Sequence, residues 1–268
     1  MKKIVMILLV VALAAVMLTG CVSINFSPDG SPFSVMGFNV NNAEFMFGPG
    51  PGSLTGRGSV ETFTFDVGEI TEIRVEMLCN INYYSAPSDT VTFQVQPNLM
   101  DYIVIEEVGG VLTVRATRNI TFSGTANTPV LTVSTSSLNR IFHAGAGRLT
   151  TFDPISGDSF SLDVAGAADG NVKLDVRELN VGLAGAGSFE LSGTADDANI
   201  DMAGAGRLDA FDLKTQTASI NMAGAGIVRI SCSESLKVVA GGVGTVEYKG
   251  SPTLDITRGG LVSIKQVD

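Results

Sequence analysis

A four-residue motif, AGAG, recurs at nearly even intervals through the second half of this 268-residue chain. It stands at 144–147, 184–187, 203–206 and 223–226, and the close variant AGAA occupies 165–168. The first residues of these five copies are 21, 19, 19 and 20 positions apart. Such a period is typical of architectures in which one small structural unit stacks on the next.

The residues before each copy alternate between apolar and polar, and two degenerate copies anchored at Val239 and Thr257 continue the series. Apolar side chains stand three positions before the anchor, at Ile141, Leu162, Val181, Ile200, Ile220, Leu236 and Leu254. The position one before the anchor is held by His143, Val164, Leu183, Met202, Met222, Val238 and Ile256. This alternation predicts one strand per repeat with a buried and an exposed face.

Because no helical periodicity separates these strands, the repeat predicts an all-β fold, a parallel β-solenoid with about 16–21 residues per coil. AGAG would be its corner, where equivalent residues of successive coils lie over one another and leave room only for small side chains. A phosphate-binding loop is disfavoured, because strands rather than a helix follow the glycines and GK[ST] is absent.

The chain upstream of the repeats is rich in strand patterns but less regular. Alternating runs begin at Glu61, and the two glycines of EEVGGVL (106–112) predict a hairpin. Residues 21–57 contain SPDGSP and GPGPGS, which predict a linker or partly ordered segment. We therefore expect one domain over 58–268, less regular over 58–129 and glycine-cornered over 130–262.

The first twenty residues have the pattern of an export signal. Lys2 and Lys3 precede an apolar run from Ile4 to Leu18, too short for a membrane span, and the run ends in LTGC at Cys21. LTGC resembles the bacterial lipobox, in which the cysteine is lipidated and becomes the first residue of the mature protein. The sequence thus predicts a signal peptide over 1–20 and an exported protein that a lipid on Cys21 anchors to a membrane of the cell envelope.

Two stretches carry a resemblance to a known family. They are DTVTFQVQPNLMDYIVIEEVGGVLTVRATRN (89–119) and PVLTVSTSSLNRIFHAGAGRLT (129–150), which the later AGAG copies extend. Over about residues 58–262 the chain resembles the bacterial family described as "putative auto-transporter adhesin, head GIN domain", a domain of unknown function. The resemblance implies a single-stranded β-helix or β-roll on an exported protein, and it implies no catalytic residues.

Charge and cysteine content narrow the classes of function. Without Lys2 and Lys3 the chain has 15 basic and 27 acidic residues, which disfavours a nucleic-acid partner. Besides Cys21 there are only Cys79 and Cys232, which outside the cytoplasm could form a disulfide or remain two buried thiols. With these two cysteines and the single histidine, His143, no metal-ligand spacing is present, and we expect no metal and no cofactor.

A polar column is predicted on the exposed face of the repeat strand. Its members are Asp163, Asp201, Asn221 and Asp255, interrupted by Gly182 and Lys237. The interruptions favour a solvated polar face over a calcium site. A polysaccharide-acting enzyme would instead use Asp163 and Asp201 with Arg148 or Arg207, but these residues form no compact cluster in the pattern.

These observations favour a non-catalytic module of the cell envelope. It would present its strand faces to an envelope polymer or a surface protein, as an adhesion or scaffold module. The alternatives are a polysaccharide-acting enzyme and a purely structural envelope protein without a specific ligand.

Overall fold

The computed structural model describes residues 34–35, 38–39, 53–122 and 127–268. The predicted signal peptide, Cys21 and most of the predicted linker lie outside these residues. Two short N-terminal strands, β1 (Ser34–Val35) and β2 (Phe38–Asn39), pair with each other, and β1 contacts β13. None of the helices among the described residues is long and apolar enough to cross a membrane.

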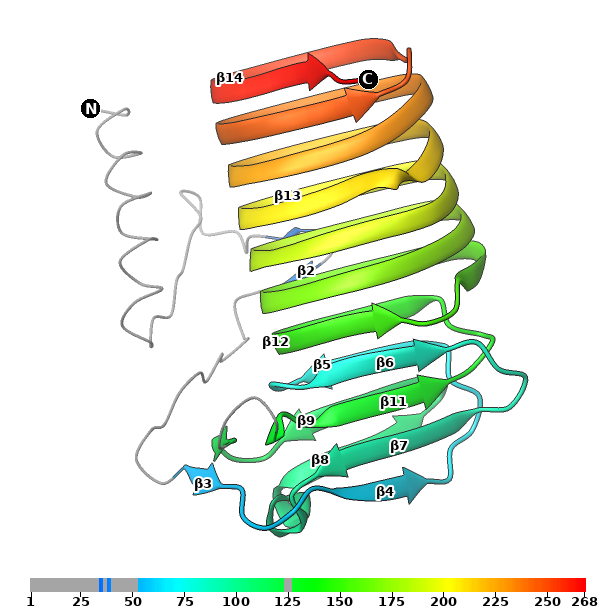
Figure 1. The fold of residues 1–268 in the computed structure, drawn as a ribbon, viewed down its shortest axis with the longest axis vertical. Helices are drawn as coiled ribbons and strands as arrows, with labels where there is room; N and C mark the ends of the chain where they lie inside the picture. Colours follow the sequence, from blue (N-terminus) through cyan, green and yellow to red (C-terminus); the bar gives the residue numbers. More distant parts are fainter. Residues whose placement is uncertain (1–33, 36–37, 40–52, 123–126) are drawn as a thin grey trace.

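The N-terminal end of the domain is a base of short strands with antiparallel pairs (Figure 1). Strand β7 (Thr90–Val95) pairs in antiparallel fashion with β4 (Glu61–Phe65) on one side and with β11 (Val130–Ser134) on the other. The 3-10 helix η2 (Pro97–Tyr102) follows β7 and leads into β8 (Ile103–Val108).

The predicted hairpin is present in this base. β8 and β9 (Val111–Ala116) pair in antiparallel fashion, and Val108 faces Val111 across the turn. Gly109 and Gly110 form that turn with φ of 62° and 86°, values that favour glycine at both positions. Two further short strands, β3 (Leu54–Thr55) and β10 (Ile120–Thr121), form a separate parallel pair.

The prediction of a parallel β-solenoid is therefore wrong. Antiparallel pairs β4–β7, β7–β11 and β8–β9 belong to the same sheet as the parallel pairs, so the domain is one curled sheet of mixed direction. For β8–β9 the physical reason is local, because the tight Gly109–Gly110 turn reverses the chain and places the two strands side by side in antiparallel fashion. The pairs β4–β7 and β7–β11 join strands that are distant in sequence, so no tight turn determines their direction.

The base joins the C-terminal part through a parallel step. β12 (Arg140–Thr151) pairs with β5 (Glu72–Glu76) through its first residues and with β6 (Asn80–Tyr84) through its last. β9 pairs with β5 in turn, and β11 with β6. The chain from 72 to 84 thus forms the layer that receives the repeats.

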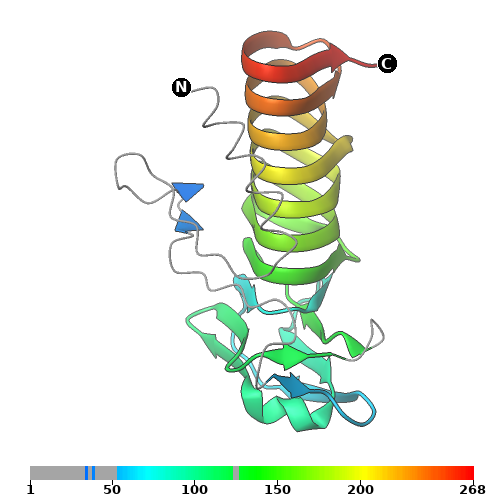
Figure 2. The same cartoon turned by 90° about the vertical axis from the view of Figure 1, so that its left-hand side faces the viewer.

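The repeats themselves form the long strands β12, β13 (Ile155–Lys249) and β14 (Thr253–Gln266), which curl over one another (Figures 1 and 2). We call one passage from an AGAG corner to the next a circuit. β12 pairs with the start of β13 in parallel, and the end of β13 pairs with β14 in parallel. Corner glycines that face one another lie at positions 145, 166, 185, 204, 224, 242 and 260.

These positions correct the predicted repeat length. Successive corner glycines are separated by 21, 19, 19, 20, 18 and 18 residues, so the 16-residue repeat that anchoring at Val239 implied does not exist. Val239 faces Thr257, as predicted, but Gly224 faces Gly242, which shifts both degenerate copies by two residues against the earlier ones.

The second residue of the corner is glycine for two reasons. Gly166, Gly185 and Gly204 have φ of 132° to 133°, a backbone conformation that disfavours a side chain. A Cβ at Gly185 would also overlap the carbonyl oxygen of Gly166, and a Cβ at Gly204 that of Gly185. The constraint is therefore contact between a side chain and the backbone of the preceding circuit, rather than contact between two side chains.

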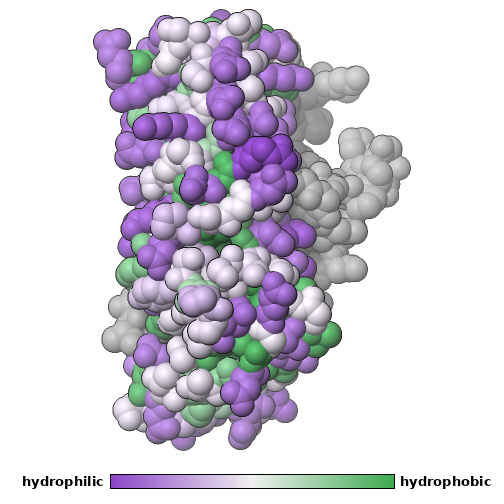
Figure 3. Space-filling model, turned by 90° about the vertical axis from the view of Figure 1, so that its right-hand side faces the viewer, coloured by the Kyte–Doolittle hydropathy of each residue, from purple (hydrophilic) through white to green (hydrophobic). Residues whose placement is uncertain are grey.

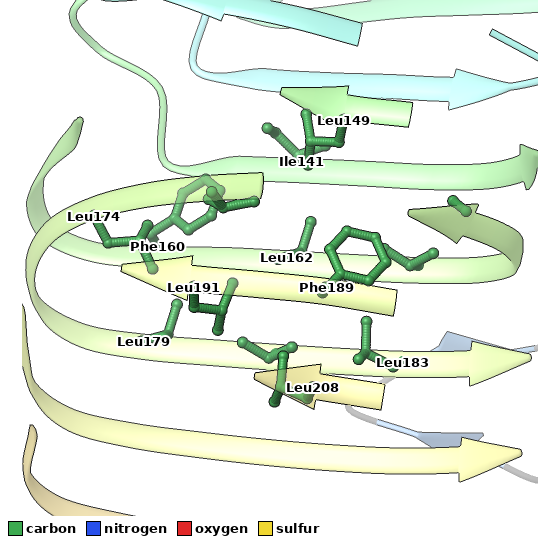
Figure 4. Close-up of a cluster of buried hydrophobic side chains, with 14 of the residues drawn as sticks. Ile141, Leu149, Phe160, Leu162, Leu174, Leu179, Leu183, Phe189, Leu191 and Leu208 are labelled. Carbon is green, nitrogen blue, oxygen red and sulfur yellow. The ribbon is translucent and has the colours of Figure 1, made fainter. Parts of the chain in front are cut away.

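The core lies between the two long sides of each circuit (Figure 4). Strands before the corner contribute Leu162 and Leu183, and strands after it contribute Phe189 and Leu208, all at most 9% exposed. At the opposite end of the circuit, shown in Figure 3, hydrophilic side chains prevail on the surface. There the circuits are joined by side-chain hydrogen bonds from Thr194 to Asp175 and from Gln216 to Asp196.

Candidate binding surface

Only some of the residues predicted to form one polar column are aligned on neighbouring strands. Asn221 donates a hydrogen bond to Asp201 Oδ1 at 2.7 Å, so these two side chains are neighbours on adjacent circuits, as predicted. Asp255 instead faces Lys237, in the adjacent column, because of the two-residue shift of the last circuits. The four residues Asp163, Asp201, Asn221 and Asp255 therefore do not form one continuous ladder.

Asp163 is not solvated. It is 6% exposed, and Arg140 donates two hydrogen bonds to its Oδ2, at 2.8 and 3.1 Å. Burial raises the pKa of Asp163 above its usual value, although Arg140 opposes this change. Phe142 faces Asp163 from the neighbouring strand, with the Arg74 guanidinium 4.6 Å from its ring centroid. We interpret Asp163 as part of a structural ion pair rather than as a binding residue.

No group of three or more His, Cys, Asp or Glu side chains that could hold a metal ion occurs among the described residues. We therefore expect millimolar calcium to leave the melting temperature of the protein unchanged, as measured by thermal unfolding monitored by circular dichroism. A site that binds the folded state with a dissociation constant a hundredfold below the calcium concentration would add about 2.7 kcal/mol. A rise in melting temperature of several degrees would contradict this expectation.

The cysteines and the histidine lie in the core. Cys79 and Cys232 are separate buried thiols: Cys79 lies beneath Gly147, and Cys232 beneath Gly250. Burial raises the pKa of Cys79 to about 12, so its thiol is unreactive. His143 is 1% exposed, and neither ring nitrogen has a partner at good hydrogen-bond geometry among the described residues.

A different surface combines charged and aromatic side chains on the long side that follows each AGAG corner, toward the viewer in Figure 1. Outward positions alternate there with buried ones such as Leu149, Val172 and Leu208. We call this surface the cation–aromatic face. Its members are Tyr84, Arg148, Phe152, Asp169, Lys173, Glu190, Arg207, Asp209, Phe211, Arg229, Glu247, Lys249 and Lys265.

One column of this face is a chain of ion pairs. Asp209 pairs with Arg229 at 2.9 Å, Arg229 with Glu247 at 2.7 Å, and Glu247 with Lys265 at 2.8 Å. Arg207 adds a further contact to Asp209 at 2.9 Å. Hydrogen bonds from Lys265 and Arg229 lower the pKa of Glu247, so this carboxylate stays ionised. The chain links the strands that follow four successive corners.

The adjacent column holds the aromatic rings. The rings of Tyr84 and Phe152 are parallel with centroids 4.6 Å apart, and Phe152 is 45% exposed. Lys173, one circuit further on, donates a hydrogen bond to the Phe152 carbonyl at 2.9 Å. Phe211 has two cations near its ring centroid: the Arg229 guanidinium at 5.6 Å and Lys249 Nζ at 5.0 Å. Such cation–ring contacts hold the rings in place at the surface.

With this geometry described, the chain can be compared with known proteins. The model of the family described as "Putative auto-transporter adhesin, head GIN domain" matches residues 69–252. The chain belongs to this family. The family description indicates an exported or surface location and assigns no activity.

Solved structures share the fold of this GIN-family chain. A "putative adhesin" from Bacteroides fragilis is 22% identical with a TM-score of 0.72, covering 80% of this chain and 100% of that one. A "putative lipid binding protein" from Parabacteroides distasonis is 22% identical with a TM-score of 0.63, covering 81% and 100%. A "putative adhesin" from Parabacteroides merdae is 18% identical with a TM-score of 0.62, covering 81% and 99%. No curated protein matches the chain significantly.

The GIN-family chain also has a small hollow beneath its AGAG corners. Val164, Leu183 and Met202 line it together with corner glycines and alanines, and its volume is about 20 Å³. Ligand pockets usually measure several hundred cubic ångströms, so this hollow is too small for a ligand.

Sequence reasoning identified the strands of this GIN-family domain but not the cation–aromatic face. The available signal was Phe211 in GRLDAFDLKTQ, an aromatic residue at an outward position of an alternating strand, followed 38 residues later by Lys249. Phe152 also occupies an outward position of an alternating strand. Because it lies in a less regular connection, TFDPIS, its alignment with Phe211 is not evident from the sequence.

Proposed function

We propose that this protein is a non-catalytic binding module of the bacterial cell envelope that uses its cation–aromatic face to hold an extended polymer or a surface protein. The observation behind the proposal is the combination of one exposed ring, Phe152, and one half-buried ring, Phe211, with cations along several circuits of a regular sheet. Such a long, even surface suits an extended partner better than a small molecule. The adhesin-like family to which the chain belongs supports a binding role.

The test is adhesion of cells that produce the full-length chain to immobilised envelope material. We expect the double variant Phe152→Ser and Phe211→Ser to lose most of this adhesion. The control is Val108→Ser, which removes a side chain that is 71% exposed at the tip of the β8–β9 hairpin, away from this face. Equal adhesion of all variants would show that this face is not the binding surface. No adhesion in the wild type would indicate a purely structural envelope protein.

We further propose that a lipid on Cys21 anchors the protein to a membrane. The basic start, the apolar run and LTGC support this. In cells labelled with a palmitate analogue, the wild-type chain should acquire the label and sediment with membranes. Cys21→Ser should lose the label and leave the membrane fraction, because anchorage depends on the buried acyl chains. Cys79→Ser is the matched control, and an unchanged distribution of Cys21→Ser would refute the anchor.

A further inference from the structure

We propose that the ligand of the cation–aromatic face is an acidic polysaccharide, whose sugar rings stack on Phe152 and Phe211 and whose carboxylate or sulfate groups lie beside Lys173 and Lys249. This inference rests on the proposed binding function and names the chemical class of its ligand.

The first argument is charge. The chain has 17 basic and 27 acidic residues, whereas the thirteen residues of the cation–aromatic face include six cations and four acids, with exposed Asp175 and Asp212 at its border. Its cations are Arg148, Lys173, Arg207, Arg229, Lys249 and Lys265, and its acids are Asp169, Glu190, Asp209 and Glu247. A basic face on an acidic protein directs an anionic ligand to that face, since the remaining surface repels it.

The second argument is which of these cations are neutralised. Arg207, Arg229 and Lys265 have carboxylate partners within 2.9 Å. Arg148, Lys173 and Lys249 form no ion pair with any described residue. Lys249 has instead the Phe211 ring at 5.0 Å, and Lys173 the Phe152 carbonyl at 2.9 Å. Lys249 thus offers an unneutralised charge beside the Phe211 ring, and Lys173 offers one at the backbone of Phe152.

The third argument is the pairing of charge with an apolar platform. The face of an aromatic ring carries negative partial charge and attracts the C–H groups on the flat side of a pyranose. A ring with an ammonium beside it therefore matches a sugar that bears an acidic substituent. Phe152 and Phe211 occupy one column three circuits apart, a distance of about 14 Å at the usual spacing of neighbouring strands. A ligand that contacts both rings must be an oligomer of several sugars.

The same charges disfavour nucleic acid. Duplex DNA carries a charge for about every 1.7 Å of its axis, and an acidic protein with three free cations on one face cannot match that density. A polysaccharide with one acidic group per one or two sugars has a much lower charge density, comparable to one free cation per two or three circuits.

The experiment measures binding of the full-length chain, purified in detergent, to polygalacturonate and to dextran as a neutral polymer. We expect polygalacturonate to bind in a salt-sensitive manner and dextran not to bind. Phe211→Ser should bind polygalacturonate about tenfold more weakly, because a stacked ring contributes about 1.4 kcal/mol. Lys249→Gln should bind up to about fivefold more weakly, as expected for one exposed charge.

The variants are matched to the fold. Phe211→Ser introduces the residue that the same column holds one circuit before and after, at Ser192 and Ser231, so unchanged thermal unfolding is expected. Lys237→Gln removes an exposed lysine from the other long side and should bind like the wild type. Equal binding of dextran, or an equal loss in Lys237→Gln, would overturn the proposal. If face variants abolish adhesion to envelope material but polygalacturonate does not bind, the ligand class is wrong and the binding function stands.

Discussion

Replacing Gly185 by alanine should destabilise the domain by about 3–5 kcal/mol, the sum of a strained backbone and an overpacked contact. Gly185 has φ of 133°, and a Cβ there would overlap the carbonyl oxygen of Gly166 on the preceding circuit. The clash is with backbone, which cannot rotate away as a side chain could. Equilibrium denaturation of the wild type and the variant measures the difference in unfolding free energy.

Gly241→Ala is the matched control. Gly241 occupies the first corner position, where earlier circuits have alanine, and nothing lies within 4 Å of a Cβ built there. Its φ lies outside the left-handed region, so we expect a change of less than about 1 kcal/mol. Similar losses at both positions would show that the corner requires glycine for some reason other than contact with the circuit beneath.

The corner was predictable because its cause is periodic. Equivalent residues face one another in successive circuits, so the same requirement for glycine applies at Gly166, Gly185 and Gly204. It appears in the sequence as a repeated motif. The β8–β9 hairpin was predictable for a local reason, because two adjacent glycines with positive φ determine the reversal.

The direction of pairing in the base was not predictable in the same way. An alternating run such as TVTFQV predicts a strand with one buried face, but it does not indicate which strand pairs with it. β7 lies between β4 and β11, which are far apart in sequence, and both pairs are antiparallel. A mixed sheet therefore replaced the expected parallel one.

The polar surface shows a similar limit. Alternation correctly indicated that Asp163 points away from the core, but not that Arg140 and a 6% exposed environment enclose it. Conversely, Phe152 and Phe211 look like core residues by type, and only their phase in the alternation reveals that they face outward. Cross-circuit pairs such as Arg229–Glu247 need the correct separation of 18 residues, in place of the 16 implied by the sequence pattern, before they can be recognised.

The second large effect is expected on acidification, through His143. Its ring is 1% exposed, and neither nitrogen has a described partner at good hydrogen-bond geometry. Burial lowers the pKa of His143 to about 4, although the nearby polar backbone groups of Met77 and Ala146 partly oppose this. The unfolded chain has the ordinary pKa of about 6.5 and so binds the proton more readily. The free energy of unfolding is therefore unaffected by this titration above about pH 6.5 and decreases as the pH falls toward 4. The decrease is about 2 kcal/mol at pH 5 and about 3 kcal/mol in total.

His143→Val should remove this loss. Val75 of β5 and Val164 of β13 face His143 from the two neighbouring strands, so valine fits the column. The variant should be at least as stable as the wild type at pH 7, because two buried nitrogens without partners are removed. The gap should widen to about 2 kcal/mol in its favour at pH 5. Denaturant unfolding at pH 7, 6 and 5 measures both effects.

Because His143 is the only histidine in the chain, the difference between the two pH profiles isolates its contribution from that of the carboxylates, which both proteins share. Parallel profiles would mean that the ring titrates alike in the folded and unfolded states, and hence that water or a polar group reaches it. A variant that is less stable than the wild type at every pH would mean that the lost ring volume outweighs the removed desolvation. Only a gap that opens between pH 6.5 and 5 agrees with a neutral histidine enclosed between two valines.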